Sequence, residues 1–235
     1  MKPCIVILLC LLVCACGGDY QQEDGHIVFV TANEGQGTVK TLVQGADIAS
    51  FRDLGNYYAV DKNRAYRGSG AISGAHAASF VVIAPDYAKD DAQVYYSHKP
   101  IAHADPASFV VIDPNYARDR NDVYMQGEPM HVCDASSFHR VADELDSRNW
   151  AIDNQCAYVR GVRLPGAHPR SFRVLGYEYA KDDVQAYSST FGVIRDADAA
   201  TFEMPKSPCN ICARDKYRCY SSGKPTPCNP RFFPQ

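Results

Sequence analysis

Six phenylalanines recur at nearly constant intervals along this chain of 235 residues, and their spacing limits what the chain can fold into. The intervals are 29, 29, 29, 34 and 30 residues. Self-similarity at such a period is the signature of a repeat protein, in which each copy is one small structural unit. A polar residue that recurs in every copy is therefore expected to serve folding, which leaves few polar residues for a unique catalytic site. The phenylalanines are Phe51, Phe80, Phe109, Phe138, Phe172 and Phe202.

The first half of each copy has the pattern of a β-hairpin. It begins with an aromatic residue and alanine, continues through an aspartate, and reaches a second aromatic residue eight positions after the first. This short spacing around a polar turn is a hairpin signal, and the aspartate can accept hydrogen bonds from the amides of its own turn. The first aromatic row is Tyr58, Tyr87, Tyr116, Trp150 and Tyr179, the second is Tyr66, Tyr95, Tyr124, Tyr158, Tyr187 and Tyr220, and the aspartates are Asp61, Asp90, Asp119, Asp153, Asp182 and Asp215.

The second half of each copy closes with a polar segment that ends at the phenylalanine. In the third copy this segment begins with Asp105 and Pro106. Aspartate is a good N-cap and proline is favoured at the first helical position, so the segment predicts one helical turn. The β-branched run after Phe109 predicts a strand, although its Phe and Ile three residues apart would also suit a longer helix.

These patterns predict a mainly all-β fold of tandem hairpin repeats of about 29 residues with short helical turns, forming an extended or solenoid-like β array. A repeat with about three short strands is too small for a propeller blade, which takes roughly 40 or more residues. We expect a repeat domain over residues 26–205, with about six units and an amino-terminal half-unit at 26–43. A Cys- and Pro-rich carboxy-terminal cap is expected over residues 206–235.

The repeated Tyr-Ala-x-Asp-x-x-x-x-Tyr pattern resembles the DKNYY family of bacterial repeat proteins, most closely at Asp61-Lys62-Asn63. The resemblance covers about residues 43–225. The copies depart from it at the fourth place, where Arg64, Gln93, Asp122 and Gln185 stand. The resemblance implies an exported lipoprotein and supports the repeat architecture, but it implies no reaction.

The amino terminus has the features of an export signal. Lys2 precedes an apolar run that is shorter than the roughly 20 residues needed to span a bilayer, so residues 1–15 are predicted to be a removable signal peptide. Its end resembles a lipobox, with Cys16 as the lipidated residue; Cys14 is the weaker alternative, and an ordinary secretory signal is another. Residues 16–25 are expected to form a flexible tether. The predicted location is the bacterial cell envelope, lipid-anchored, and in a two-membrane bacterium at the outer membrane or facing the periplasm.

The charges argue against a nucleic-acid surface. Lys and Arg number 24 against 27 Asp and Glu, and no basic run is present. We therefore expect no nucleic-acid partner and attribute membrane attachment to the amino-terminal lipid alone. Nothing in the sequence calls for a cofactor.

Six cysteines remain after Cys4, Cys10 and Cys14 of the signal and the proposed lipid site are set aside. An even number in an exported chain predicts disulfides. Cys133 and Cys156 are expected to pair across a repeat junction. The four tail cysteines are expected to pair among themselves, with open connectivity and a preference for nested Cys209–Cys228 and Cys212–Cys219. Zinc is the alternative, but no second close pair matches Cys209 and Cys212.

Each row of recurring residues has a functional and a structural interpretation. The aromatic rows could stack on sugar rings or on a partner, but a packed ladder is the simpler interpretation. The aspartate row could bind calcium, but one aspartate per repeat suits turn capping better. The fourth copy is the most individual, with an insertion near Val141–Arg148, so Trp150 and Tyr158 are the candidate binding surface. The alternative there is a long loop held by a disulfide.

The sequence therefore predicts a binding or scaffold protein that engages another envelope protein. Binding of cell-wall or surface glycan, or an immunity or inhibitor role against a secreted toxin, are the alternatives. No nucleophile elbow, zinc-binding helix or phosphate loop is present, so we predict no catalytic residue, no metal site and no enzyme activity; an envelope hydrolase is the least favoured class.

Overall fold

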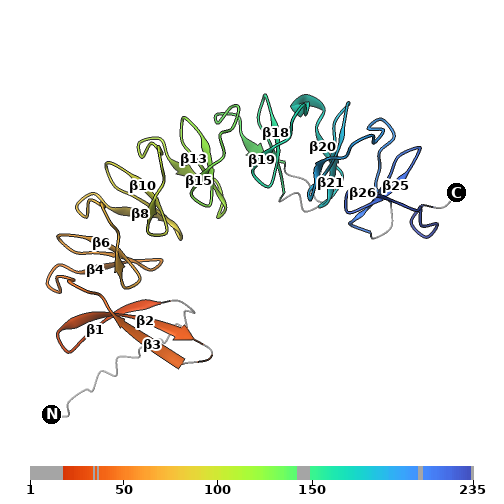
Figure 1. The fold of residues 1–235 in the computed structure, drawn as a ribbon. Coiled ribbons are helices and arrows are strands. Elements are labelled where there is room, and N and C mark those ends of the chain that lie inside the picture. The colour runs from red at the N-terminus through yellow and green to blue at the C-terminus, as the bar shows by residue number, and fades with distance from the viewer. Residues whose placement is uncertain (1–17, 34, 36, 142–148, 206–208, 234–235) are drawn as a thin grey trace, which may run out of the picture. The chain divides into compact units, whose positions relative to one another are not determined.

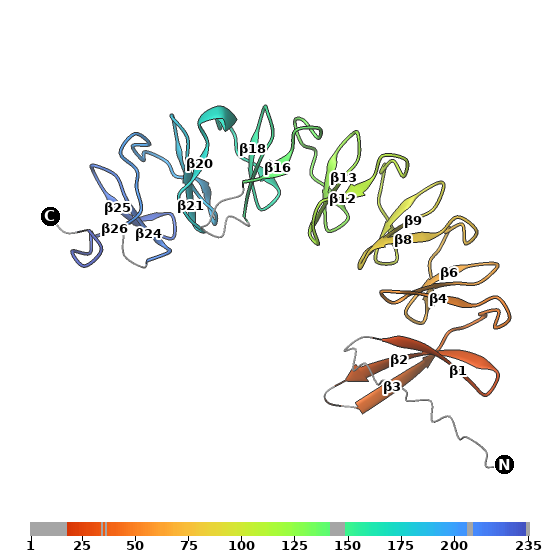
Figure 2. The same cartoon turned by 180° about the vertical axis from the view of Figure 1, so that it is seen from behind.

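The computed structural model describes residues 18–33, 35, 37–141, 149–205 and 209–233, and within them the chain forms seven small antiparallel sheets in tandem (Figure 1). The chain divides into two compact parts, one up to Pro100 and one from Ile101 onward. Every sheet is a meander in which strands that are neighbours in sequence are also neighbours in space, as the reverse view shows (Figure 2).

The amino-terminal part holds three sheets. Their strands are β1 (Asp19–Glu23), β2 (His26–Asn33) and β3 (Gly37–Leu42); β4 (Arg52–Gly55), β5 (Tyr58–Val60), β6 (Ala65–Arg67) and β7 (Gly70–Ala71); and β8 (Val81–Ala84), β9 (Tyr87–Lys89), β10 (Val94–Tyr96) and β11 (Lys99–Pro100). The first is called the amino-terminal sheet below, and the other two are repeats 1 and 2.

The carboxy-terminal part holds repeats 3 to 6. Their strands are β12 (Val110–Val111), β13 (Tyr116–Arg118), β14 (Val123–Met125) and β15 (Glu128–Pro129); β16 (His139–Arg140), β17 (Trp150–Ile152), β18 (Ala157–Val159) and β19 (Val162–Arg163); β20 (Arg173–Val174), β21 (Tyr179–Lys181), β22 (Ala186–Ser188) and β23 (Gly192–Val193); and β24 (Cys212–Arg214), β25 (Cys219–Ser221) and β26 (Lys224–Thr226).

Within each part of the chain, the recurring phenylalanine joins one repeat to the next. The ring of Phe80 lies 6.0 Å from that of Tyr58 in repeat 1 and 5.8 Å from that of Tyr95 in repeat 2. Phe202 makes the same two contacts in the other part, at 5.5 Å from Tyr179 and 5.4 Å from Tyr220. Burying one such side chain contributes about 1.5–3 kcal/mol. The constant spacing of phenylalanines therefore reflects one shared contact between consecutive repeats.

The central hairpin of each repeat pairs a small residue with a large one. Ala117 lies directly opposite Tyr124 in the register of β13 and β14, and both are buried. The same alanine–tyrosine pair recurs in the other repeats, at Ala59–Tyr66, Ala88–Tyr95, Ala151–Tyr158, Ala180–Tyr187 and Ala213–Tyr220. The alanine leaves room for the ring, which explains why alanine recurs at this position of each hairpin.

The structure confirms the tandem β-repeat fold and refines its elements. Repeats 1 to 5 have four strands rather than about three, because a strand of two residues follows each hairpin. The closing segment is a tight turn, as in the 3.2 Å bond from the Ser108 amide to the Asp105 carbonyl. It is a short 3₁₀ helix at Pro169–Ser171, the one helical element among the described residues.

Two expected boundaries are wrong. Strand β1 lies inside the expected tether 16–25 and pairs along its length with β2, so the repeat architecture begins at Asp19 rather than at residue 26. The expected cap over 206–235 contains a three-stranded sheet of the repeat type, and a bridge between Glu203 and Arg214 adds the equivalent of a first strand. The predicted signal peptide and Cys16 lie outside the described residues.

None of the described segments is a helix with the length and apolar character needed to cross a membrane.

Candidate functional site

The recurring aspartate is the structural centre of each repeat. In repeat 3, Oδ1 of Asp119 accepts the backbone N–H groups of Asn121 at 2.7 Å and Asp122 at 2.9 Å. Its Oδ2 accepts the Tyr124 hydroxyl at 2.8 Å and the backbone N–H of Asp105 at 2.7 Å. All four acceptor positions of the carboxylate are therefore used by the fold, which leaves none for calcium. The bond between aspartate Oδ2 and tyrosine hydroxyl recurs at Asp61–Tyr66, Asp90–Tyr95, Asp153–Tyr158, Asp182–Tyr187 and Asp215–Tyr220.

These bonds set the ionisation of the cluster. Burial alone would raise the pKa of Asp119, but the hydrogen bonds from the three amides and from Tyr124 outweigh it and lower that pKa. The partner tyrosines respond in the opposite direction: burial, and then the bond to Asp61, raise the pKa of Tyr66 to about 12. Asp119 is therefore held as a carboxylate and Tyr66 as a neutral donor, which is a structural arrangement.

Two tyrosines of the first aromatic row, Tyr58 and Tyr179, bond to the backbone of the following repeat. The hydroxyl of Tyr58 donates toward the carbonyls of Asp86 at 3.0 Å and Ser97 at 2.9 Å. Tyr20 on β1 does the same toward the carbonyls of Tyr57 at 2.7 Å and Gly68 at 2.8 Å, so the amino-terminal sheet joins repeat 1 by the same contact.

The two candidate binding residues of the fourth repeat are buried. Trp150 is 0% exposed and Tyr158 is 1% exposed. The Trp150 ring packs on Phe172 with centroids 5.9 Å apart, and its Nε1 has no hydrogen-bond partner among the described residues. The Tyr158 hydroxyl bonds Asp153 and accepts the Cys133 amide. Neither side chain can stack on a ligand, so the prediction of a binding surface at these residues is wrong; both belong to the aromatic ladder.

The end of each sheet that carries the aspartate turn, here called the aspartate edge, is stabilised by paired side chains. The first residue of the closing segment faces the residue after the recurring aspartate, as in the 2.7 Å ion pair between Asp105 and Arg120. In repeats 2 and 5 the order is reversed, with histidine in the closing segment and aspartate in the turn. The pairs are Asp47–Lys62, His76–Asp91, Asp105–Arg120, Asp134–Asn154, His168–Asp183 and Asp198–Lys216.

The reversed pairs form neither a catalytic triad nor a metal site. His76 and Ser79 both bond the same oxygen of Asp91, at 2.7 and 2.8 Å, whereas a triad needs the serine hydroxyl on the imidazole. Ligand atoms of His76, Asp90 and Asp91 lie within 4.8 Å of one another. Both oxygens of Asp90 are already engaged by amides and by Tyr95, so this grouping is part of the turn.

The opposite end of each sheet, here called the two-turn edge, consists of the turn between the first and second strands and the turn between the third and fourth. The bond between these two turns that recurs in all six repeats joins backbone groups. An amide of the second turn donates to a carbonyl of the first: Gly68 to Tyr57, Ser97 to Asp86, Gln126 to Asn115, Arg160 to Asn149, Ser189 to Glu178 and Ser222 to Ile211, all at 2.7–2.8 Å. This recurring bond does not depend on side-chain type, and the side chains at these positions vary among the repeats.

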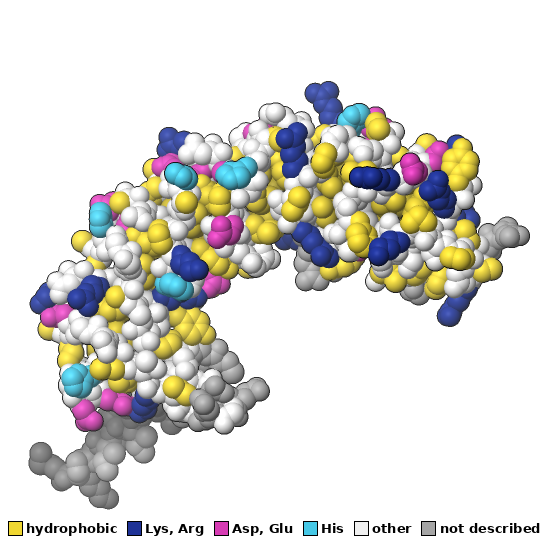
Figure 3. All heavy atoms as spheres, viewed as in Figure 1, with side chains coloured by type: hydrophobic (Ala, Val, Ile, Leu, Met, Phe, Trp, Pro, Cys, Tyr) yellow, Lys and Arg dark blue, Asp and Glu magenta, His cyan; other side chains and the backbone are white. Residues whose placement is uncertain are grey.

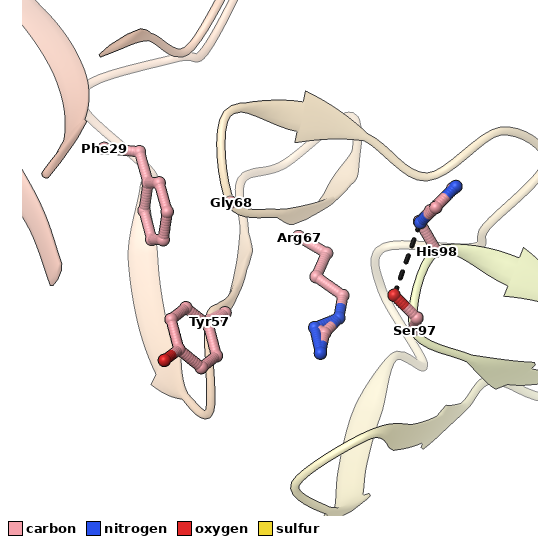
Figure 4. A pocket seen from close by; sticks show the side chains of 6 residues that line it. All are labelled: Phe29, Tyr57, Arg67, Gly68, Ser97 and His98. Atoms are coloured by element: carbon pink, nitrogen blue, oxygen red, sulfur yellow. Dashed lines mark hydrogen bonds between the residues drawn. The ribbon is translucent and has the colours of Figure 1, made fainter. Parts of the chain in front are cut away.

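A shallow pocket of about 350 Å³ lies at the two-turn edge of the amino-terminal part, lined by Phe29, Tyr57, Arg67, Gly68, Ser97 and His98 (Figure 4). Tyr57 is 40% exposed, and the Arg67 guanidinium lies 5.6 Å from its ring centroid. Asn56 and Tyr57 have φ angles of 52° and 68°, in a turn where the second place normally favours glycine. Holding a bulky residue there costs about 1–2 kcal/mol, so the position of this ring opposes a local preference.

An apolar groove of about 460 Å³ lies at the two-turn edge of repeats 4 and 5. Its apolar lining includes Val162, which is 65% exposed, and Phe191, which is 52% exposed. Arg160 and Arg163 stand at its rim, and neither has an ion-pair partner within the described parts of the chain. A neighbouring depression of about 400 Å³ also includes Arg160, together with Tyr177 and Tyr116.

A buried carboxylate lies beside this groove. Glu178 is 4% exposed and accepts the hydroxyls of Ser188 at 2.6 Å, Ser189 at 2.7 Å and Thr190 at 3.4 Å. None of these hydroxyls contacts a histidine in the described structure, so the cluster lacks the base that a serine nucleophile requires. Its bonds fix the turn that carries Phe191.

Tyr57, Arg160 and Phe191 were not predicted as candidate binding residues, because they do not belong to the rows of recurring residues. The useful signal is the opposite one: the positions just before the first aromatic residue and just after the second, where the residue type varies among the repeats. The insertion near Val141–Arg148 lies between β16 and β17 in the sequence, and its residues 142–148 are outside the described residues.

The disulfides are partly those expected. Cys133 is joined to Cys156 across the junction of repeats 3 and 4. The nested arrangement of the tail is wrong: Cys209 is joined to Cys212, and Cys219 to Cys228. The register of β24 and β25 sets Arg214 opposite Cys219 and therefore leaves Cys212 in a diagonal position, beyond the roughly 7 Å that a disulfide can bridge.

Charges of both signs are interspersed on the face of the molecule drawn in Figure 3. In comparisons with known proteins, the model of the DKNYY family matches residues 24–148. No curated protein and no solved structure matches the chain.

Proposed function

The chain belongs to the DKNYY family, and we propose on that premise that it is a lipid-anchored envelope protein that binds another protein through its two-turn edge. The role is binding rather than catalysis, because the recurring polar groups of the described residues are consumed by the fold. The aspartates, for example, each accept bonds from turn amides and a tyrosine.

The observation that carries the proposal is the contrast between the two ends of each sheet. At the aspartate edge the bonds that recur are made by a side chain, the aspartate, whereas at the two-turn edge the bond that recurs in every repeat joins backbone groups. In repeat proteins the surface whose residues vary between copies, and into which insertions fall, is often the binding surface. Exposed Tyr57, Tyr177, Val162 and Phe191 all lie at this edge.

Two features support an extracytoplasmic, membrane-attached location. Three disulfides suit an oxidising compartment. The apolar amino-terminal run followed by Cys16 suits export and lipidation. Cys16→Ser should abolish lipid labelling and release the protein from membranes. Label that persists in Cys16→Ser and disappears in Cys14→Ser would assign the anchor to the other cysteine.

The binding role is tested by affinity capture from detergent-solubilised envelope with the full chain as bait. A stoichiometric protein partner should be retained by the native chain and lost with Phe191→Asp. Val184→Asp is the matched control, because Val184 is 55% exposed but lies at the aspartate edge of the same repeat. Failure to recover any partner in repeated captures would count against the proposal.

A second candidate, glycan binding, is favoured by the pocket at Tyr57. An exposed aromatic ring beside hydroxyl, imidazole and guanidinium groups suits the apolar face and hydroxyls of a sugar. Tyr57→Gly removes the ring and relieves its turn, so the variant should fold with unchanged or greater stability while losing retention on envelope polysaccharide. Equal retention of Tyr57→Gly and the native chain would exclude this pocket. Trp150 cannot serve in this test because it is buried.

A further inference from the structure

We infer that the apolar groove of repeats 4 and 5 receives an extended segment of the partner in which apolar side chains are flanked by aspartate or glutamate. This inference rests on the proposed binding function and names the chemistry of the partner. The juxtaposition that carries it is an exposed apolar lining beside two arginines, Arg160 and Arg163, that have no ion-pair partner among the described residues.

The apolar character of the groove is particular to this place in the array. The residue that begins the fourth strand is Gly70, Lys99, Glu128 and Gly192 in repeats 1, 2, 3 and 5, but Val162 in repeat 4. Phe191, opposite it, stands in a turn that is one residue longer than its counterparts, since Tyr187 lies 15 rather than 14 residues before the next phenylalanine. Neither side chain is needed by the repeat, and both remain more than half exposed.

The shape favours a chain segment over a flat surface. Leu164 and Val159 form the buried part of the lining, and Gly192 brings its backbone close to Leu164, with 3.7 Å between an added Cβ and the leucine methyl group. A bilayer surface cannot enter a depression of about 460 Å³, whereas apolar side chains can fill it. The lining residues come from adjacent turns of two repeats, at 159–165 and 189–193.

The charge around the groove selects acidic flanks. Arg160 and Arg163 line it, and the Lys224 ammonium lies 4.9 Å from the Phe191 ring centroid. No acidic side chain is among its lining residues, although the whole chain carries a formal charge of −3. The nearby Glu178 carboxylate is buried and engaged by three hydroxyls. An incoming carboxylate therefore meets arginine donors suited to bidentate bonding.

The test is selection of random peptides displayed on phage by the purified, oxidised chain, followed by affinity measurement on the enriched peptides. We expect enrichment of sequences that combine Leu, Ile or Phe with Asp or Glu, and affinity that falls with salt. Phe191→Asp and, separately, Arg160→Glu should each weaken binding about tenfold or more. Val184→Asp should leave it unchanged.

The outcomes separate this inference from the proposed function. Enriched peptides without acidic residues, binding unaffected by Arg160→Glu, or binding confined to anionic lipid vesicles would overturn the inference. So would self-association of the chain that Phe191→Asp abolishes, because the occupant would then be a second copy. If a captured envelope partner remains bound to both groove variants, the groove assignment fails while a binding function elsewhere stands. Because Phe191 and Arg160 are exposed, both variants should retain the native circular dichroism spectrum.

Discussion

Replacing Tyr124 by phenylalanine removes one hydroxyl from the buried cluster of repeat 3 and leaves the aromatic contact with Phe109 in place. The Asp119 carboxylate then keeps three of its four donors, the amides of Asn121, Asp122 and Asp105. A hydrogen bond to a charged group contributes about 1.5–3 kcal/mol net. Since three donors still compensate the charge, we expect a loss of about 2 kcal/mol in the free energy of unfolding.

The loss should depend on pH in a defined direction. The folded pKa of Asp119 is lowered, so its bonds contribute stability above the unfolded pKa of about 3.9, and that contribution is lost as pH falls through the folded pKa. Tyr124→Phe raises the folded pKa by removing a donor. The difference between native and variant should therefore be full at pH 7 and shrink once the carboxyl is protonated in both.

Urea unfolding between pH 7 and pH 2, combined with native-state hydrogen exchange, measures both effects. Exchange should accelerate most for amides of repeat 3 and its neighbours, because the units of a repeat array couple mainly to adjacent units. Tyr177→Phe is the control: its ring is 40% exposed, and the change should stay within about 0.5 kcal/mol. A stability difference for Tyr124→Phe that is the same at pH 7 and pH 2 would refute the assignment of the loss to the carboxylate bond.

Three further predictions address other features. Replacing Cys133 and Cys156 by serine removes a disulfide with a sequence separation of 23, which should lower the free energy of unfolding by about 3 kcal/mol. Hydrogen exchange should accelerate in repeats 3 and 4 before the rest of the chain; uniform acceleration would contradict nearest-neighbour coupling. Trp150→Ala should cost about 3–5 kcal/mol in thermal unfolding, as a buried ladder residue, and a loss below about 1 kcal/mol would place the ring outside the core. The hydrogen bond of the His76 ring to the Asp91 carboxylate raises the pKa of His76. The pair therefore stabilises the fold below the unfolded pKa of about 6.5 and ceases to do so as pH rises through the folded pKa. An NMR titration in which Asp91→Asn does not lower the pKa of His76 would disprove the pairing.

Much of the fold could be predicted because the same local sequence pattern recurs in each repeat. The spacing of Phe80 and Tyr95, and the aspartate between two aromatic residues, identify hairpins that differ little from those observed. The fourth bond of each aspartate could not be predicted, because its donor lies 14 residues earlier in most repeats and reaches it only through the closing turn. Strand β1 was missed because Asp19–Glu23 is polar, and its pairing with β2 compensates for weak propensity.

The candidate site was predictable in position but not in residues. The fourth repeat was singled out by its insertion and its tryptophan, and the apolar groove does lie at repeats 4 and 5. Trp150 did not indicate the groove, because an aromatic residue at this recurring position is buried in the packed ladder, as in the other repeats. Phe191 and Arg160 do not belong to any recurring sequence pattern. They line the same groove because two turns from different repeats stack there.

The reversal of charge order at the aspartate edge bears on how the array avoids misassembly. Tandem copies so alike in sequence could dock out of step by one repeat during folding, a common failure of repeat proteins. Such a slip would bring Asp47 beside Asp91 and His76 beside Arg120, where the native partners are Lys62 and Asp91. Each pair is exposed and contributes little alone. Together, the reversals of polarity at repeats 2 and 5 oppose a slip of one repeat past them, so that nearly identical units remain distinguishable from one another.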